Sequence, residues 1–274
     1  MSPRIIDQLE IISRELTKYT CQLFIDKEGK KEYPVPFGSA VLFAHNKNHY
    51  LISCAHVLID QDSNPPYFFK SKNEISTIGG ENLFTRLSKL TKRINDKYDF
   101  SIVKLSNKTI QNLMQTGHKF LDESDILTGY EPTANDYAMC IGYPANRTNV
   151  NVKTKTIEMK GLKYVSKFLK SDFTKSGFNP KFHFVIKYSI NNFINNNTKT
   201  KSRGPKPVGL SGGGVWAIIT NENKQRLIKL VGILTEYMEE HSILVSTRID
   251  LIIESIRQKF DPSLKNKGVL VDII

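Results

Sequence analysis

The sequence predicts an all-β protein with a helix near each end. Short segments rich in β-branched and aromatic residues recur along the chain, and turn-forming residues such as Gly, Pro, Asn and Asp separate them. Regular alternation of strands and helices is missing, which disfavours a parallel doubly wound sheet. Apolar residues at helical spacing lie near both chain ends. We therefore expect an antiparallel barrel or sandwich.

The individual elements follow from local patterns. Apolar residues from Ile5 to Leu16 recur at helical spacing and predict an amphipathic helix over 4–18. Residues 106–117 fit a short helix, and a final helix over 246–260 can be capped by Ser246 or Thr247. We expect strands over 19–25, 38–44, 49–55, 98–105, 136–144, 151–159, 181–190, 213–220, 227–236 and 241–247.

Composition sets further bounds on the protein. The length of 274 residues suffices for one large domain or two small ones. No apolar run approaches the roughly 20 residues of a membrane-spanning helix, and acids interrupt the apolar residues of the N-terminus, so we expect a cytoplasmic protein. The cysteines Cys21, Cys54 and Cys140 are too scattered for a disulfide framework, and Cys54 and Cys140 fit buried hydrophobic positions. No metal-ligand spacing occurs, so we expect no metal or organic cofactor.

The net charge of +12 is concentrated in one part of the chain. Residues 150–206 hold 12 Lys and one Arg against two acids, a net of +11. This segment fits either a solvated basic surface or a site for an acidic partner, which would be nucleic acid or an acidic protein. Phe182, Phe184 and Ile186 alternate like one face of a strand, so we expect these aromatics in the core rather than stacked on bases.

A glycine-rich serine is the strongest chemical signal. The stretch "KPVGLSGGGVW", residues 206–216, lacks the lysine followed by Ser or Thr of a phosphate loop. Glycines around a serine let the backbone bend sharply and bring bare N–H groups close to a substrate carbonyl. A serine hydroxyl also needs a histidine base, and a further group must orient that histidine.

The order of the partner residues separates two kinds of hydrolase. "GLSGG" satisfies the nucleophile elbow of α/β-hydrolases, but those need the acid and then the histidine downstream. Only His241 lies beyond Ser211, with its acids immediately before it, and the alternation of strands and helices is missing. The other order places His56 at the end of an apolar strand and Asp99 at the entry to a second strand. Asp96 is close but lies in a polar turn, so Asp99 is preferred.

This set of motifs resembles the trypsin-like serine peptidases of the chymotrypsin fold, in a bacterial-type intracellular member. The resemblance spans 20–258, and it implies two packed six-stranded antiparallel β-barrels with an N-terminal and a C-terminal helix. Its matching pieces are Gly38-Ser39, Ala55-His56, Asp99 with "FSIVKL", "GLSGG" around Ser211, and "LVGILTE" about twenty residues later. The division it implies is a helix at 1–18, a first barrel at 19–118, a linker at 119–135, a second barrel at 136–246, and a helix with tail at 247–274.

The resemblance also implies roles for individual residues. Ser211 would attack the scissile carbonyl, His56 would act as its base, and Asp99 would orient the imidazole. The N–H groups of Gly209 and Ser211 would form the oxyanion hole. The substrate pocket would be lined by Pro205, Lys206, Thr235 and Tyr237. No acid lies at the pocket base, which favours small or medium uncharged side chains over Lys or Arg at the cleavage position; Lys206 could instead attract an acidic side chain.

Leu210 stands where many members of that family have an aspartate that pairs with a new N-terminus after zymogen cleavage. We therefore expect no activation by that salt bridge. The disulfide usual beside the catalytic histidine of secreted members is also missing, which agrees with a reducing compartment. The expected function is a serine endopeptidase that cleaves a specific partner protein and is either constitutively formed or switched by a regulatory protein. The alternative is a catalytically silent binding module for nucleic acid or an acidic protein; no membrane partner is expected.

Overall fold

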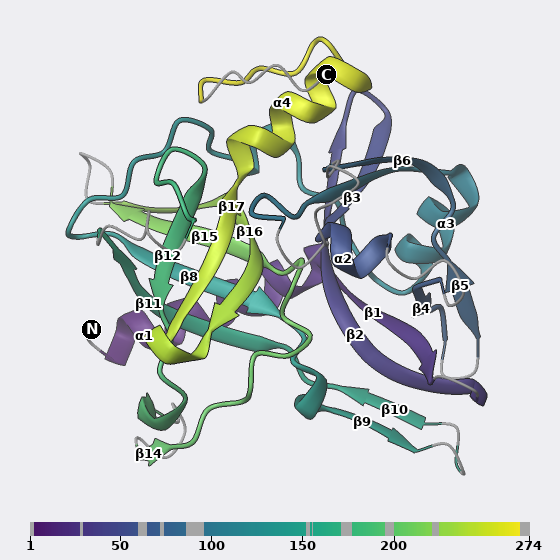
Figure 1. Ribbon diagram of the computed structural model, residues 1–274, viewed down its shortest axis with the longest axis horizontal. Coiled ribbons are helices and arrows are strands. Elements are labelled where there is room, and N and C mark those ends of the chain that lie inside the picture. Colours follow the sequence, from purple (N-terminus) through teal and green to yellow (C-terminus); the bar gives the residue numbers. More distant parts are fainter. Residues whose placement is uncertain are drawn as a thin grey trace.

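Two antiparallel β-sheets make up most of the molecule, one from each half of the chain (Figure 1). The computed structural model describes residues 3–27, 30–59, 65–71, 74–85, 96–151, 154, 156–170, 177–194, 200–220 and 225–268. A closed six-stranded barrel lies beside a curled open sheet, and helices are few. This architecture confirms the predicted all-β, chymotrypsin-like fold class.

The first sheet has seven strands in the order β5-β4-β1-β2-β3-β7-β6. It is open among the residues that the structure describes, which differs from the closed six-stranded barrel expected here. The outer strands β4, β5 and β6 have only three to five residues each, so they extend the curl of the sheet without closing it. The strands are β1 Thr20–Lys27, β2 Lys30–His45, β3 Asn48–Ser53, β4 Tyr67–Phe69, β5 Ile75–Thr77, β6 Gly80–Phe84 and β7 Ser101–Leu105.

The second sheet closes into the predicted six-stranded barrel, in the order β11-β12-β17-β16-β15-β8. Its long strand β16 pairs with both β15 and β17, and a register shift lies in each ladder. Those shifts are β-bulges or similar irregularities, which bend a strand. The strands are β8 Tyr137–Gly142, β11 Leu162–Leu169, β12 His183–Lys187, β15 Gly214–Thr220, β16 Arg226–Met238 and β17 Ile243–Arg248.

Two small ladders lie outside these sheets. Thr148–Asn151 (β9) and Thr156–Met159 (β10) form a hairpin that projects from the body of the molecule (Figure 1). The single strand expected over 151–159 is therefore wrong, because the chain turns back between the two halves of that segment. Phe193–Ile194 (β13) pairs with Lys201–Ser202 (β14) in the loop that precedes the glycine-rich serine.

Helices occur at both predicted ends. The terminal helices are α1 Pro3–Leu16 and α4 Ile249–Lys259, and the internal ones are α2 Ala55–Leu58 and α3 Asn107–Gln115. The Ser106 side chain caps α3, and Gly117, at φ +82°, follows its end. Across the described part of the chain, no helix has the length and apolar character needed to cross a membrane. The described residues also include single turns of 3-10 helix at η1 Thr17–Tyr19, η3 Glu123–Asp125, η4 Ala145–Arg147, η6 Ile190–Asn192 and η7 Glu239–His241.

One hydrophobic cluster joins the two sheets. It contains Val41 and Ile52 from the first sheet, Trp216 and Ile233 from the barrel, and the buried face of α4. The two halves therefore share core rather than merely touching. The three cysteines are buried and free, as the sequence predicted for two of them.

Candidate active site

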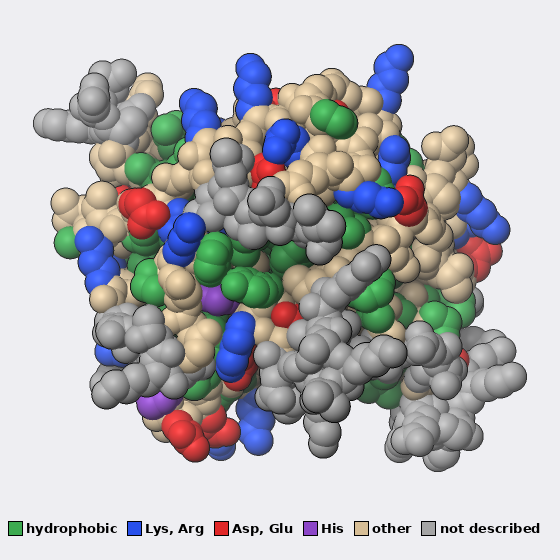
Figure 2. Space-filling model, turned by 45° about the horizontal axis from the view of Figure 1, so that its top comes forward, with side chains coloured by type: hydrophobic (Ala, Val, Ile, Leu, Met, Phe, Trp, Pro, Cys, Tyr) green, Lys and Arg blue, Asp and Glu red, His purple; other side chains and the backbone are tan. Residues whose placement is uncertain are grey.

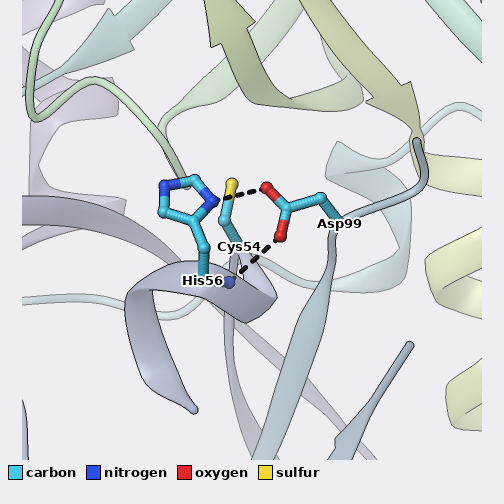
Figure 3. A group of neighbouring side chains, drawn as sticks. All are labelled: Cys54, His56 and Asp99. Carbon is cyan, nitrogen blue, oxygen red and sulfur yellow. Dashed lines mark hydrogen bonds and ion pairs between the residues drawn. The ribbon is translucent and has the colours of Figure 1, made fainter. Parts of the chain in front are cut away.

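His56 and Asp99 form a doubly hydrogen-bonded pair (Figure 3). His56 lies in the single turn of α2, directly after β3, and its Nδ1 is 2.5 Å from Oδ2 of Asp99. The backbone N–H of His56 donates to the other carboxylate oxygen at 3.0 Å. Because a carboxylate accepts, Nδ1 is the donor of this bond, so the neutral form of the ring has its lone pair on Nε2. The Asp99 side chain is 10% exposed and that of His56 is 37% exposed, so the imidazole can reach a substrate.

The backbone around Asp99 is held in an unusual conformation. Asp99 has φ +37°, which few non-glycine residues adopt. The preceding carbonyls are held from the second half of the chain, because Thr247 Oγ1 donates to Tyr98 O at 2.5 Å and His183 Nε2 lies 2.8 Å from Lys97 O. Burial lowers the pKa of His183, which favours a neutral ring there. Surrounding structure thus maintains the strained position of Asp99.

Asp96 has a different task from Asp99. Its carboxylate accepts the Tyr98 N–H at 3.1 Å and the Thr85 hydroxyl. These bonds tie the turn that leads into Asp99, and the carboxylate that contacts His56 is that of Asp99. The structure thus pairs His56 with the acid that the sequence favoured.

Two consecutive turns form the loop around Ser211. Leu210 N–H donates to Pro207 O at 2.9 Å, and Gly213 N–H donates to Leu210 O at 2.8 Å. Within the described ranges, neither the N–H of Gly209 nor that of Ser211 donates a hydrogen bond. Gly209 has φ +90°, a conformation that favours glycine. The loop therefore offers two N–H groups, the arrangement that an oxyanion hole requires.

Close backbone contact docks this loop on the first sheet. Ser39 N–H donates to Ser211 O at 2.8 Å. Gly212 has φ +85°, and a Cβ there would lie 1.9 Å from Ser39 O and 2.2 Å from Ser53 Oγ. Only glycine fits this position. Because Ser53 precedes His56 by three residues, the docking brings the serine loop to the strand that leads to the histidine.

The Ser211 hydroxyl has a different partner from the one expected. It donates to the carbonyl oxygen of Thr235, on β16, at 3.3 Å. No hydrogen bond joins it to His56 in the described structure. The Thr235 hydroxyl donates to Val245 O at 3.3 Å. Catalytic hydrogen bonds are often absent or long without substrate, so the catalytic roles of Ser211 and His56 stay predictions.

Two of the predicted substrate-pocket residues, Pro205 and Tyr237, contact a tyrosine that the sequence did not single out. Tyr188 is fully buried, and its hydroxyl donates to Pro205 O at 2.7 Å. Its ring contacts that of Tyr237 edge-on, with centroids 5.6 Å apart. Lys206 is exposed. The only sequence signal for Tyr188 was its place at the end of an alternating segment, which is equally typical of core. The pocket roles stay predictions.

Cys54 completes the surroundings of the His56–Asp99 pair. One ligand atom from each of these three residues lies within 4.8 Å of the others, the only such cluster of possible metal ligands among the described residues. The thiol is fully buried, and burial and then the charge of Asp99 raise its pKa well above the usual value. Nδ1 of His56 and the Asp99 carboxylate already bond directly to each other, so a metal ion at this cluster would have to replace that hydrogen bond.

Comparisons with known proteins leave the family of the chain open. No protein-family model matches the sequence, and no curated protein matches it. The fold is similar to that of the thermostable serine protease AL20 from an extremophilic microorganism, with 13% identity, a TM-score of 0.47, and coverage of 90% of this chain and 97% of that one.

Two further solved structures give similar figures. The serine endoprotease from Yersinia pestis is 15% identical with a TM-score of 0.46, covering 93% of this chain and 67% of that one. A Glu endopeptidase is 15% identical with a TM-score of 0.45, covering 88% and 92%. Identities this low, with TM-scores below 0.5, say nothing about activity or substrate.

Proposed function

We propose that the protein is a serine endopeptidase that uses His56, Asp99 and Ser211. The observation that carries the proposal is the His56–Asp99 pair beside a glycine-rich serine loop with two N–H groups that donate to no described partner. A histidine that served only the core would have no reason to keep 37% of its side chain exposed. A plain glycine turn would have no reason to dock its serine on the strand that leads to a histidine. The combination therefore supports nucleophilic catalysis on an acyl group.

In the proposed reaction, the Ser211 hydroxyl first turns from Thr235 O toward Nε2 of His56. Oγ then attacks the scissile carbonyl while Nε2 takes its proton, and Asp99 stabilises the resulting imidazolium. The imidazolium returns that proton to the leaving amine, which breaks the C–N bond and leaves an acyl-serine. Water, deprotonated by His56, releases the new carboxylate and restores the serine.

The oxyanion of each tetrahedral intermediate would accept the N–H groups of Gly209 and Ser211. One such donor contributes about 3 kcal/mol in related sites. Leu210, between them, is 2% exposed in the core of the barrel. This apolar surrounding offers no partner to a buried ammonium, which supports a site that forms without the salt bridge of trypsin-like zymogens.

The proposed substrate is a peptide segment of a specific partner protein, and a regulatory protein partner fits an enzyme that lacks that zymogen switch. Tyr188 and Tyr237 fill space beside Pro205, which favours small or medium uncharged side chains at the cleavage position. A peptide library assayed with the purified protein tests this preference. Selective cleavage after Lys or Arg would contradict it.

A fluorophosphonate probe tests the proposed chemistry directly. We expect labelling of the wild type, complete loss in Ser211→Ala, and a loss of at least about 10³-fold in His56→Ala. The matched controls are Ser202→Ala, at an exposed position, and His49→Ala, at a half-buried position earlier on β3; both should label normally. A wild type that neither reacts with the probe nor cleaves an unfolded protein would overturn the proposal.

The basic segment 150–206 is the feature that favours the alternative function, a binding module for nucleic acid or an acidic protein. Lys160 pairs with Glu158 at 2.9 Å, and Lys167 lies over the Tyr137 ring at 3.7 Å. On the face drawn in Figure 2, the Lys and Arg side chains are scattered rather than gathered in one patch. Residues 152, 153, 155, 171–176 and 195–199 of the segment lie outside the described residues. Tight, strongly salt-dependent binding of DNA or RNA, without probe labelling, would favour this alternative.

A further inference from the structure

Cys54 lies against the concealed side of the His56–Asp99 pair. It connects the end of β3 to α2, and its side chain is fully buried. Its Sγ is within 4.8 Å of both His56 Nδ1 and a carboxylate oxygen of Asp99 (Figure 3). The thiol therefore faces the same carboxylate that orients the imidazole.

The same thiol also contacts the second barrel. Cys54 S–H donates to the carbonyl oxygen of Leu234, on β16, at 3.1 Å. Gly212 N–H donates to that oxygen at 2.8 Å. The next residue along β16 is Thr235, whose carbonyl accepts the Ser211 hydroxyl. One sulfur atom thus lies within 4.8 Å of the acid–base pair and donates a hydrogen bond to the strand that holds the nucleophile loop.

The chemistry of this position fits a hydrogen-bond donor rather than a nucleophile. Nucleophilic cysteines have a lowered pKa, whereas burial, the charge of Asp99 and the more distant Asp96 all raise the pKa of Cys54. The group is therefore a thiol with one weak donor. Two acceptors lie around it, the Asp99 carboxylate and the Leu234 carbonyl. Among the described residues, Asp99 and Cys54 are the titratable groups that form a cluster with His56.

We propose that Cys54 is a positioning residue for the proposed peptidase. Its thiol holds the Asp99 carboxylate and the Leu234 carbonyl at a fixed separation, and so sets the register between the His56–Asp99 pair and Ser211 across the two halves of the molecule. This inference rests on the proposed function for its catalytic consequence, but the contact between Cys54 and Asp99 can be tested without activity.

The experiment compares Cys54→Val, Cys54→Ala and Cys54→Ser with wild type in the full chain. In NMR titration with ¹³C-labelled histidine, replacing the polar thiol beside Asp99 by an apolar group leaves the Asp99 charge less compensated, so imidazolium is favoured and the pKa of His56 rises. We expect a rise of about half a pH unit in the Val and Ala variants. The Ser variant, which keeps a donor, should titrate like wild type. Cys140→Val, at a buried thiol of the second barrel, is the control and should leave His56 unchanged.

Peptide hydrolysis supplies the second measurement. We expect kcat to fall about tenfold in the Val and Ala variants with KM within twofold of wild type, and Ser to restore most of it. A loss of thermal stability without any shift of the His56 titration would overturn the positioning role, as would a Ser variant that behaves like Val. If the Val variant does not fold, the comparison of the Ala and Ser variants tests the positioning role of Cys54. If Ser211 of the wild type does not react with the probe, the proposed function is wrong. If the pKa of His56 is the same in wild type and the Cys54 variants, only this inference is wrong.

Discussion

The first sheet contributes side chains to the candidate site, whereas the second barrel contributes mainly backbone groups. His56 and Asp99 meet through two hydrogen bonds to one carboxylate, at 2.5 Å from the imidazole and at 3.0 Å from the backbone N–H. Around Ser211, by contrast, the important groups are N–H donors and carbonyls, and their placement depends on glycines at positive φ. The part of the site in the first sheet therefore depends on which side chains are present. The part around Ser211 depends on glycines, which have no side chain.

The largest expected effect comes from changing a side chain of the His56–Asp99 pair. Asp99→Asn keeps the size of the group but removes its charge, so the imidazole loses its correct tautomer and the imidazolium loses its stabilisation. We expect kcat to fall by about 10⁴-fold with little change in Tm. Steady-state hydrolysis and thermal unfolding measure both quantities. Asp96→Asn, at the acid that ties the neighbouring turn, should lose activity far less, and equal losses in the two variants would contradict the assignment.

The next largest effect comes from adding a side chain to the backbone loop around Ser211. In Gly212→Ala, the new Cβ would meet Ser39 O and Ser53 Oγ at distances that no side chain tolerates. We expect the free energy of unfolding to fall by about 3 kcal/mol and probe labelling to be lost. Gly117→Ala is the matched control, because Gly117 has φ +82° with nothing within 4 Å of its Cβ position.

The control should cost only about 1 kcal/mol, the strain of the backbone alone. Urea denaturation of both variants separates this strain from the clash. Equal destabilisation of the two glycine variants would show that the serine loop does not depend on close docking against the first sheet.

The smallest expected effect concerns Asp261, whose hydrogen bonds form a joint between the segment after α4 and the first sheet, away from the candidate site. Asp261, which follows α4, accepts from Ser263, His45 and Asn48. Burial raises the pKa of its carboxyl, but these hydrogen bonds outweigh burial and bring that pKa to about 2. Because the folded pKa lies below the unfolded value of 3.8, the stabilisation is fully present above pH 4 and is lost as the pH falls toward 2.

Asp261→Asn should therefore lower the free energy of unfolding by about 1–2 kcal/mol at pH 6. The difference from wild type should shrink progressively below pH 4. Chemical denaturation at several pH values measures it. Peptidase activity should be unchanged within about twofold, because the joint contacts none of the proposed catalytic groups. A difference in stability that persists at pH 2 would contradict the assignment of the low pKa.

The contact between His56 and Asp99 could be predicted because each residue lies beside an apolar strand, where local pattern is informative. The open form of the first sheet could not be predicted from the sequence, because its outer strands are too short to show a hydrophobic pattern of their own. Likewise, Cys54 fits the sequence equally well as a small core residue, and its place beside Asp99 depends on how two distant strands pack. Whether Ser211 acts with His56 stays a prediction, as do the domain boundaries.

The bonds from Thr247 to Tyr98 and from His183 to Lys97 also order events during synthesis. Domains generally fold as units, N-terminal first, as the chain leaves the ribosome. A nascent chain that has emerged only as far as β7 already contains His56 and Asp99, yet it lacks the groups that hold the backbone before Asp99. Chemistry of the proposed kind can therefore begin only after β17 has been translated and packed against the first half of the chain.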